Sequence, residues 1–167
     1  KDTNVKRVFE NLPAVQQYLV DTFWQENEKP EFSKNPIKVL FIDIETYSPD
    51  EFPKPNDPTH VCNVITVYDS LSDRFITWGL KDFNVKEDDV TYVKCSSERE
   101  LFKKFVEYIE SDYPDIMSGW NSEFFDMPYI INRCERLLGE EWKNRLSPSG
   151  KVYSRSIKGQ FGIETTR

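Results

Sequence analysis

Two acidic residues, Asp43 and Glu45, stand two positions apart at the end of an apolar run that begins at Ile37. Side chains at alternate positions of a β-strand point to the same face, so a strand over 37–45 would bring the two carboxylates together. The apolar run predicts a buried central strand, where neighbouring carboxylates are costly unless a cation offsets their charge. Oxygen ligands of this kind suit Mg²⁺ or Mn²⁺. The alternative is a strand end at which both acids reach water.

A second polar segment runs from Asn121 to Asp126, directly after residues 115–120, which we expect to form a strand. Open α/β sheets bind their ligands at the carboxyl ends of strands, which is where this segment lies. Asp126 could complete a three-carboxylate cluster with Asp43 and Glu45, or it could cap the helix expected to follow it. Asn121 could donate a hydrogen bond to a phosphate or orient a ligand. Residue types and spacing leave these alternatives open.

Other kinds of site are poorly supported by the sequence. The single histidine, His60, lies in a proline-rich loop, which argues against a Ser-His-Asp triad and a histidine-rich zinc site. There is no G-x-x-x-x-G-K-[ST] phosphate loop and no G-x-G-x-x-G dinucleotide motif. The three cysteines are scattered without a C-x-x-C pair, which disfavours a disulfide framework and fits a reducing cytoplasm. No apolar run approaches the roughly 20 residues of a membrane helix, so no membrane partner is expected.

Charge is unevenly distributed along the chain. The net charge is −7, which disfavours a non-specific nucleic-acid binder. Residues 143–167 nevertheless contain six Lys and Arg residues and one acid, Glu164. An acidic body with a basic arm could place a metal site beside a phosphate contact. The alternative is that these basic residues simply lie on a solvated hairpin.

The elements that must position these residues follow from apolar spacing and turn signals. A helix is predicted over 5–24, interrupted by Pro13, and is followed by a polar linker over 25–36 that we take as a domain boundary. Strands are predicted over 37–45, 61–69, 74–80, 90–94 and 115–120, and a β-hairpin over 151–166. The four prolines between positions 47 and 60 predict an irregular loop.

Two further helices complete the pattern, over 97–111 and 128–139. Ser97 and Glu100 match a capping box, in which each side chain accepts a free backbone N–H at the helix start. Pro128 suits the first position of the second helix. This order of strands and helices predicts an α/β domain with a mixed central sheet flanked by helices.

The two acidic segments together resemble a known family. Residues 41–46, Phe-Ile-Asp-Ile-Glu-Thr, resemble the Exo I motif of family B DNA polymerases. Residues 119–133 resemble their Exo II motif, with the core N-x-x-x-F-D followed by apolar-Pro-Tyr-apolar-x-x-Arg, and the separation of about 80 residues also fits. Stretches over 48–53, 65–70, 73–75 and 145–152 are similar to polymerases of T-even-like bacteriophages. The resemblance covers roughly 37–167, so residues 1–36 are expected to be a remnant of a polymerase N-terminal domain.

The resemblance implies a ribonuclease H-like fold and a 3′→5′ proofreading exonuclease that hydrolyses the terminal nucleotide of single-stranded DNA with two Mg²⁺ or Mn²⁺ ions. Asp43, Glu45 and Asp126 match three of the four metal-binding, catalytic carboxylates of the DEDD pattern. The fourth belongs to the Exo III motif, Y-x-x-x-D, and no aspartate follows Asp126. Residues 37–167 are therefore expected to be a partial exonuclease domain that lacks Exo III.

The resemblance also implies substrate contacts and partners. Asn121, Phe52, Phe125 and Phe161 are the candidate substrate-binding residues. Phe52 could stack on a terminal base or instead anchor its loop, and Phe161 lies near the tip of a hairpin expected to keep primer and template apart. The expected partners are single-stranded and primer–template DNA, the rest of a polymerase chain and a sliding clamp.

Two alternative functions remain open beside the proofreading exonuclease. The chain alone is expected to bind metal weakly and to have little or no nuclease activity, because one ligand and the Exo III tyrosine are missing. A catalytically silent nucleic-acid-binding domain is one alternative, and a stand-alone ribonuclease H-like nuclease is another.

Overall fold

The computed structural model describes residues 13–23, 36–153, 156–158 and 164–166. The chain divides into two compact units, Lys1–Pro36 and Ile37–Arg167. In the first unit, helix α1 spans Ala14–Phe23 and begins directly after Pro13, whose carbonyl accepts the Gln17 N–H at 3.0 Å. Proline fits at a helix start because its missing N–H has no partner there. The predicted segment 5–12 lies outside the described residues.

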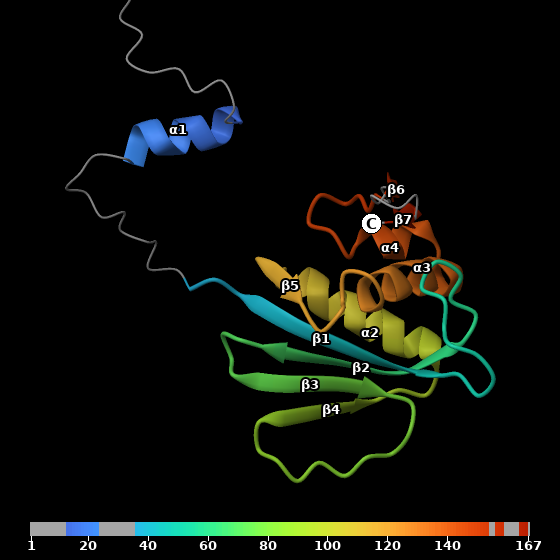
Figure 1. Cartoon of the computed structure of the whole chain (residues 1–167). Helices are drawn as coiled ribbons and strands as arrows, with labels where there is room; N and C mark the ends of the chain where they lie inside the picture. Colours follow the sequence, from blue (N-terminus) through green and yellow to red (C-terminus); the bar gives the residue numbers. More distant parts are fainter. Residues whose placement is uncertain (1–12, 24–35, 154–155, 159–163, 167) are drawn as a thin grey trace, which may run out of the picture. The chain divides into compact units, whose positions relative to one another are not determined.

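A five-stranded mixed sheet forms the centre of the second unit (Figure 1). Its strands are β1 (Val39–Tyr47), β2 (Val61–Asp69), β3 (Arg74–Gly79), β4 (Val90–Lys94) and β5 (Ile116–Ser118). They lie in the order β4-β3-β2-β1-β5. The pairs β1/β2 and β2/β3 are antiparallel, whereas β3/β4 and β1/β5 are parallel. The predicted α/β fold with a mixed sheet is confirmed.

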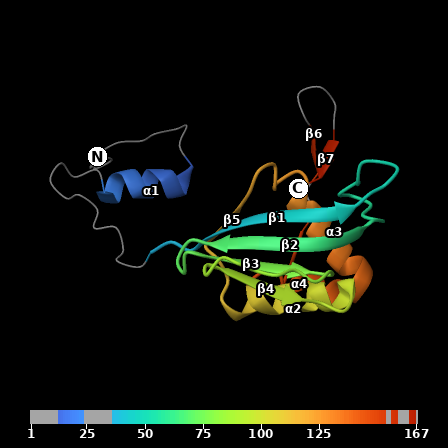
Figure 2. The same ribbon diagram turned by 90° about the horizontal axis from the view of Figure 1, so that it is seen from below.

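Helices α2 (Glu98–Ser111) and α3 (Asp126–Leu138) lie on one side of this sheet (Figure 2). Between them and the sheet lies one apolar core, as expected for a two-layer domain. Its fully or nearly buried members are Leu40, Ile42, Ile44, Cys62, Ile65, Val67, Trp78, Cys95, Leu101, Phe102, Phe105, Val106, Ile109, Tyr129, Ile130 and Cys134. No helix in the described part of the chain is long and apolar enough to cross a membrane.

Strand β1 is buried on one face only, which corrects the prediction of a fully buried central strand. Ile42 and Ile44 face the core, while Phe41, Asp43 and Glu45 are exposed on the opposite face. β1 is an interior strand, between β2 and β5, but the helices described within residues 36–153 lie on its other face. Both acids are therefore exposed, as in the alternative that the sequence left open, and burial of β1 gives no argument for a cation beside them.

The ends of α2 and α3 differ slightly from prediction. At α2, Ser97 Oγ accepts the Glu100 N–H at 3.3 Å, but the Glu100 carboxylate accepts the N–H of Ser96 at 2.7 Å rather than that of Ser97. Helix α3 begins at Asp126, so Pro128 lies third in the helix, still within the turn where N–H groups have no helical partner. A short helix that the sequence analysis did not predict, α4 (Glu140–Asn144), follows Gly139.

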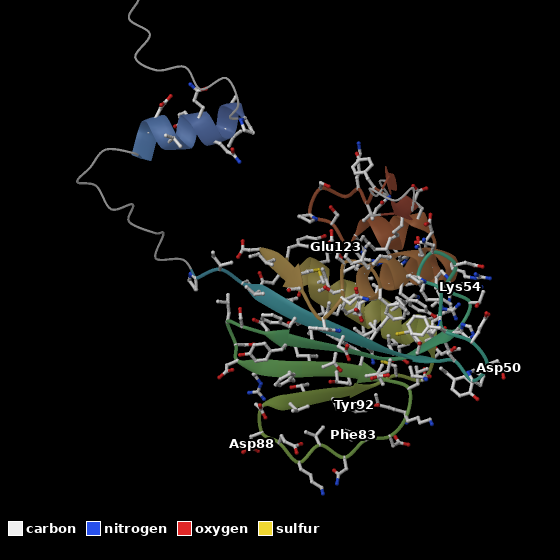
Figure 3. All side chains as sticks on the ribbon, viewed as in Figure 1. Asp50, Lys54, Phe83, Asp88, Tyr92 and Glu123 are labelled. Carbon is white, nitrogen blue, oxygen red and sulfur yellow. The ribbon has the colours of Figure 1, made fainter. Side chains whose placement is uncertain are left out.

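The segment between β1 and β2, residues 48–60, is irregular as its prolines predict. Asp50 and Lys54 project from its outer side (Figure 3). Pro53 and Pro58 are buried, so the loop is anchored at two points along its length. This loop carries Phe52, one of the candidate substrate-binding residues.

Two more features complete the described structure. The three cysteines are free and buried, and burial raises the pKa of each thiol, to about 12 for Cys134. Strands β6 (Ser156–Lys158) and β7 (Glu164–Thr166) pair antiparallel within the region where a hairpin is predicted. Residues 159–163, with the candidate substrate-binding Phe161, lie outside the described residues.

Candidate active site

The site forms where β5 ends beside the middle of β1, to which it runs parallel. Their register pairs Leu40 with Met117 and Phe41 with Ser118. Two positions beyond Phe41, β1 presents Asp43, while β5 gives way to the turn that leads into α3. Parallel pairing therefore brings two segments nearly 80 residues apart in sequence to one place, as the position of the motifs predicts.

The turn after β5 approaches the backbone of β1 closely because Gly119 has no side chain. A Cβ atom at this position would lie 2.3 Å from the carbonyl oxygen of Ile42. Asn121 adopts a left-handed conformation with φ of 56°, which asparagine tolerates better than most residues. Its carbonyl accepts the N–H groups of Phe124 and Phe125, both at 3.0 Å. Asn121 thus has a structural role in the turn besides its candidate role in substrate binding.

Asp126 is buried, with only 4% of its surface exposed, and connects α3 to β1. Its Oδ1 accepts the backbone N–H of Ile44 at 3.2 Å. Ile44 separates Asp43 from Glu45, so this hydrogen bond fixes Asp126 beside the strand that carries both acids. Asp126 does not cap α3: the N-cap residue is Phe125, and no side chain bonds to the helix end there.

The electrostatic environment of Asp126 links the three carboxylates. Burial, above all, raises the pKa of Asp126, and the negative charges of Asp43 and Glu45 raise it further. Its own N–H and that of Ile44 oppose this rise in pKa by donating hydrogen bonds to the carboxylate. A cation among these three groups would relieve both the burial of Asp126 and the mutual repulsion.

The donor atoms suit a hard divalent cation, since Asp43, Glu45 and Asp126 offer only carboxylate oxygens. Among the described residues, however, no group of three or more His, Cys, Asp and Glu side chains is arranged to hold a metal ion. The chemistry of the donors therefore fits Mg²⁺ or Mn²⁺, whereas a complete set of ligands requires side-chain movement or further groups.

A cleft of about 480 Å³ lies over this edge of the sheet. It is lined by Asp43, Ile44, Phe52, Trp120, Asn121, Phe125 and Asp126. Five of the residues singled out from the sequence thus meet in one cleft. Glu45 does not line it, although it shares the exposed face of β1 with Asp43.

Aromatic side chains border the cleft. The Phe52 side chain is 78% exposed, and its ring centroid lies 5.4 Å from that of Phe125. Trp120 is 94% exposed and was not singled out from the sequence, although its place beside Asn121 in the motif could have drawn attention to it. Exposed aromatic rings beside carboxylates can hold bases next to a hydrolytic centre.

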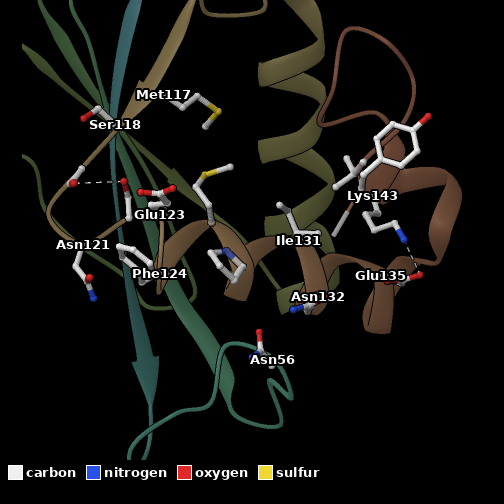
Figure 4. A pocket seen from close by; sticks show the side chains of 16 residues that line it. Asn56, Met117, Ser118, Asn121, Glu123, Phe124, Ile131, Asn132, Glu135 and Lys143 are labelled. Carbon is white, nitrogen blue, oxygen red and sulfur yellow. Dashed lines mark hydrogen bonds and ion pairs between the residues drawn. The ribbon is translucent and has the colours of Figure 1, made fainter. Parts of the chain in front are cut away.

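A larger pocket of about 760 Å³ borders the same turn, which contributes Ser122, Glu123 and Phe124 to its lining (Figure 4). Met127, Pro128 and Ile131 of α3 supply apolar lining, and Asn121 lines both this pocket and the cleft. At its far side, Lys143 Nζ contacts Glu135 Oε1 at 2.8 Å. Nothing in the sequence indicated this pocket.

Comparison with known proteins connects the geometry to a family. The family model described as "DNA polymerase family B, exonuclease domain" matches residues 13–167, and so begins before the boundary at residue 37. The chain is 32% identical to the DNA-directed DNA polymerases of Escherichia phage RB69 and Enterobacteria phage T4, over 87% of this chain and 18% of each relative. It is 30% identical to a DNA polymerase of Thermococcus litoralis, over 92% of this chain and 9% of that protein.

The chain therefore spans about a fifth of the length of its phage relatives. The match covers both acidic segments, the five-stranded sheet and helices α2 and α3, which agrees with the ribonuclease H-like fold that the sequence resemblance implies. On this match, the chain belongs to DNA polymerase family B and corresponds to its exonuclease domain.

Proposed function

We propose that this domain removes the 3′-terminal nucleotide of single-stranded DNA by metal-dependent hydrolysis, as the proofreading 3′→5′ exonuclease of a replicative DNA polymerase. The observation that carries the proposal is the hydrogen bond from the Ile44 N–H to the buried Asp126 carboxylate. It places the third acid beside the strand that presents Asp43 and Glu45, on the rim of a cleft with exposed aromatic rings.

In this proposal the three acids hold two Mg²⁺ or Mn²⁺ ions. When bound, such ions lower the pKa of an attacking water and stabilise the charge that develops on the departing 3′-oxygen. Asp43 and Glu45 supply exposed oxygens from one face of β1, and Asp126 supplies a carboxylate held in place by its backbone partner. Burial and the neighbouring negative charges raise the pKa of Asp126, so a nearby cation would stabilise the charged form of this carboxyl group.

The aromatic side chains of the cleft would hold the terminal base. Phe52 is exposed and lies against Phe125, while the buried Pro53 and Pro58 anchor the loop. This arrangement favours the stacking role of Phe52 over an anchoring role, because its ring is largely free for a base. Asn121 and, outside the described residues, Phe161 remain candidates for contacts to the displaced strand.

The larger assembly belongs to the proposal as well. Residues 1–36 would be part of a polymerase N-terminal domain, and 37–167 an exonuclease domain without its Exo III motif. The partners would be single-stranded and primer–template DNA, the remaining polymerase chain and a sliding clamp, in a cytoplasm. The chain alone would bind metal weakly and have little activity, because a fourth acid is absent.

The Asp43→Ala/Glu45→Ala double variant tests the assignment in the full-length gene product that contains this chain. Its rate of Mg²⁺-dependent degradation of a single-stranded oligonucleotide should fall by a factor of about 10² to 10³ or more, since removing one group that stabilises developing charge costs about 10²–10³. The rate is measured by release of labelled nucleotide from the 3′ end. A matched control, Asp88→Ala/Glu107→Ala, removes two exposed acids away from the cleft and should keep the parent rate. Unchanged degradation by the first double variant would refute the proposal.

A catalytically silent DNA-binding domain is the second candidate, favoured by the absence of a prearranged metal cluster among the described residues. Titration with Mn²⁺, followed by electron paramagnetic resonance, separates the two. The proposed nuclease binds Mn²⁺ in the full-length gene product and loses it in the double variant. Equal Mn²⁺ binding by both proteins would favour the silent domain.

A further inference from the structure

One side of helix α3 holds polar side chains to which the proposed hydrolysis assigns no role. Tyr129, Asn132, Arg133 and Arg136 are spaced three, four and seven positions from the first, so they lie on one face of the helix. All four contact the same partner, the loop over residues 48–60 that connects β1 to β2.

The contacts of Tyr129 and Asn132 are hydrogen bonds to carbonyl groups of that loop. Tyr129 Oη donates to the carbonyl of His60 at 2.6 Å, and Asn132 Nδ2 donates to the carbonyl of Pro55 at 2.9 Å. Asn132 and Asn56, the loop residue after Pro55, lie on facing segments at the edge of the larger pocket (Figure 4).

The two arginines hold the end of the loop next to β2. Arg133 Nη1 donates to the carbonyls of Pro58 and Thr59 at 2.9 and 3.2 Å, and Arg136 Nη1 contacts Asp57 Oδ1 at 3.0 Å. Prolines cannot donate backbone hydrogen bonds, so a loop with four of them depends on partners from outside. Helix α3 supplies these partners.

Arg133 itself is held rigidly from the other side. Its Nε and Nη2 donate to the two carboxylate oxygens of Glu98 at 2.8 and 2.7 Å, and both side chains are about nine-tenths buried. Glu98 Oε1 also accepts the N–H of Cys62, at the start of β2, at 2.8 Å. The face of α3 that binds the loop is thus connected through Glu98 to α2 and to strand β2 of the sheet.

The loop held in this way carries Phe52 to the cleft. Phe52 is too exposed to hold its own position by packing, and its ring contacts Phe125, the residue before the first residue of α3. Helix α3 therefore begins with Asp126 in the cleft and, in its next turns, fixes the loop that brings Phe52 to the other side of the same cleft.

We propose that Tyr129, Asn132 and Arg136 are positioning residues that set the placement of the Phe52 ring, and through it the binding of the 3′-terminal base. This inference rests on the proposed function of the cleft. Arg133 takes part in the same contacts, but its buried pair with Glu98 makes it a structural residue as well, so the tests use the other three.

The main test is a double-mutant cycle between α3 and the loop in the full-length gene product. Asn132→Ala and Tyr129→Phe each remove one hydrogen bond to the loop, and Phe52→Ala removes the ring. Phe52→Ala should weaken binding of single-stranded DNA by about 5-fold or more, as loss of a stacked base does. The α3 variants should weaken binding by a smaller factor and raise KM, with little change in the rate at saturating DNA. In the Phe52→Ala background they should have no further effect.

Binding is read from an oligonucleotide with 2-aminopurine at its 3′ end, whose fluorescence depends on base stacking, with Ca²⁺ replacing Mg²⁺. This measurement does not need nuclease activity, so it tests the positioning of Phe52 even if the domain does not hydrolyse DNA. Hydrolysis is tested separately, by the Asp43→Ala/Glu45→Ala variant. Asn84→Ala, in the exposed β3–β4 connection, is the matched control and should bind like the parent. Effects of Asn132→Ala and Tyr129→Phe that persist undiminished without Phe52, or no effect with Phe52 present, would overturn the inference.

A charge exchange gives a second, independent test on an exposed pair that should not impair folding. Arg136→Glu places two acids together at the loop and should weaken DNA binding by about 2-fold, since exposed ion pairs contribute little. Adding Asp57→Arg restores the opposite charges and should restore binding. Failure of the exchange to restore binding, in a variant with the parent's thermal midpoint, would count against positioning through this face.

Discussion

At the scale of single residues, Asp126 differs from the two acids that it accompanies. Asp43 and Glu45 lie in water on the outer face of β1, while Asp126 is buried against the backbone of the same strand. A buried carboxylate with two like charges nearby destabilises the folded chain when no cation is present. The site therefore combines one group fixed in position with two that are free to adapt to a ligand.

The Asp126→Asn variant should be more stable than the parent at pH 7 by roughly 0.5–2 kcal/mol in the absence of metal. Asparagine keeps an oxygen that can accept the Ile44 N–H but carries no charge. Because the folded-state pKa of Asp126 is raised, the parent folds best below the unfolded-state pKa and loses this contribution as the pH rises through the folded-state pKa.

Urea unfolding with EDTA, at pH 7 and at about pH 3.5, measures this difference. The advantage of the Asn variant should shrink at the lower pH, where the aspartate is largely protonated in both states. A variant that is less stable than the parent at pH 7 would show that the carboxylate stabilises the fold. In a separate assay at pH 7 with Mg²⁺, the nuclease rate of the Asp126→Asn variant should fall below that of the parent.

The sequence predicted which residues meet in the cleft but not how each is exposed. Asp43, Asn121 and Asp126, which line the cleft, follow from motif spacing, whereas Glu45, which was predicted with them, does not line it. Burial depends instead on which face of β1 the helices cover, and this is decided by long-range packing. The exposed Trp120 was missed for the same reason, since an aromatic residue beside a strand suggests core packing until the turn is seen.

At the scale of elements, the turn between β5 and α3 decides the geometry of the site. The sequence predicted a strand to residue 120 and a helix from 128, whereas β5 ends at Ser118 and α3 begins at Asp126. Local apolar content extends past the strand, but the close approach of Gly119 to Ile42 ends the ladder there. The bounds of β2 and β4 agree with prediction, because clear turn signals flank them. Helix α4, at five residues, is too short to show a helical period.

A Gly119→Ala variant should be destabilised by about 1–3 kcal/mol, the usual cost of overpacking. The added Cβ would meet the Ile42 carbonyl, a backbone atom that cannot rotate away, so the turn and Asp126 must shift. Chemical denaturation measures the loss of stability, and the oligonucleotide assay should show a lower rate.

Gly150→Ala is the comparison for this prediction. Nothing lies within 4 Å of a Cβ atom there, so its cost comes only from the positive φ of 66°. It should leave the nuclease rate unchanged. Equal effects of the two substitutions on that rate would argue against a special role for the turn.

At the scale of the whole chain, the apolar core of the described residues lies in the second unit. Every buried apolar residue of the described core lies between Leu40 and Cys134. Removing residues 1–36 should therefore shift the thermal midpoint of the remaining chain by no more than about 2 °C. For comparison, a loss of 1 kcal/mol in unfolding free energy lowers the thermal midpoint of a domain of this size by roughly 2–8 °C. Differential scanning calorimetry of both forms measures the midpoint, and a fall of more than about 5 °C would show that the first unit contributes to the fold.

The three buried cysteines allow local unfolding of this domain to be measured by chemical modification of their thiols. Cys62 lies on β2, Cys95 just after β4 and Cys134 on α3, so together they sample both layers of the core. Because burial raises the pKa of each thiol, little thiolate forms near neutral pH, and alkylating reagents meet no exposed sulfur while the layers stay packed. The rate at which iodoacetamide modifies each thiol then measures how often sheet and helices separate locally, without any introduced label.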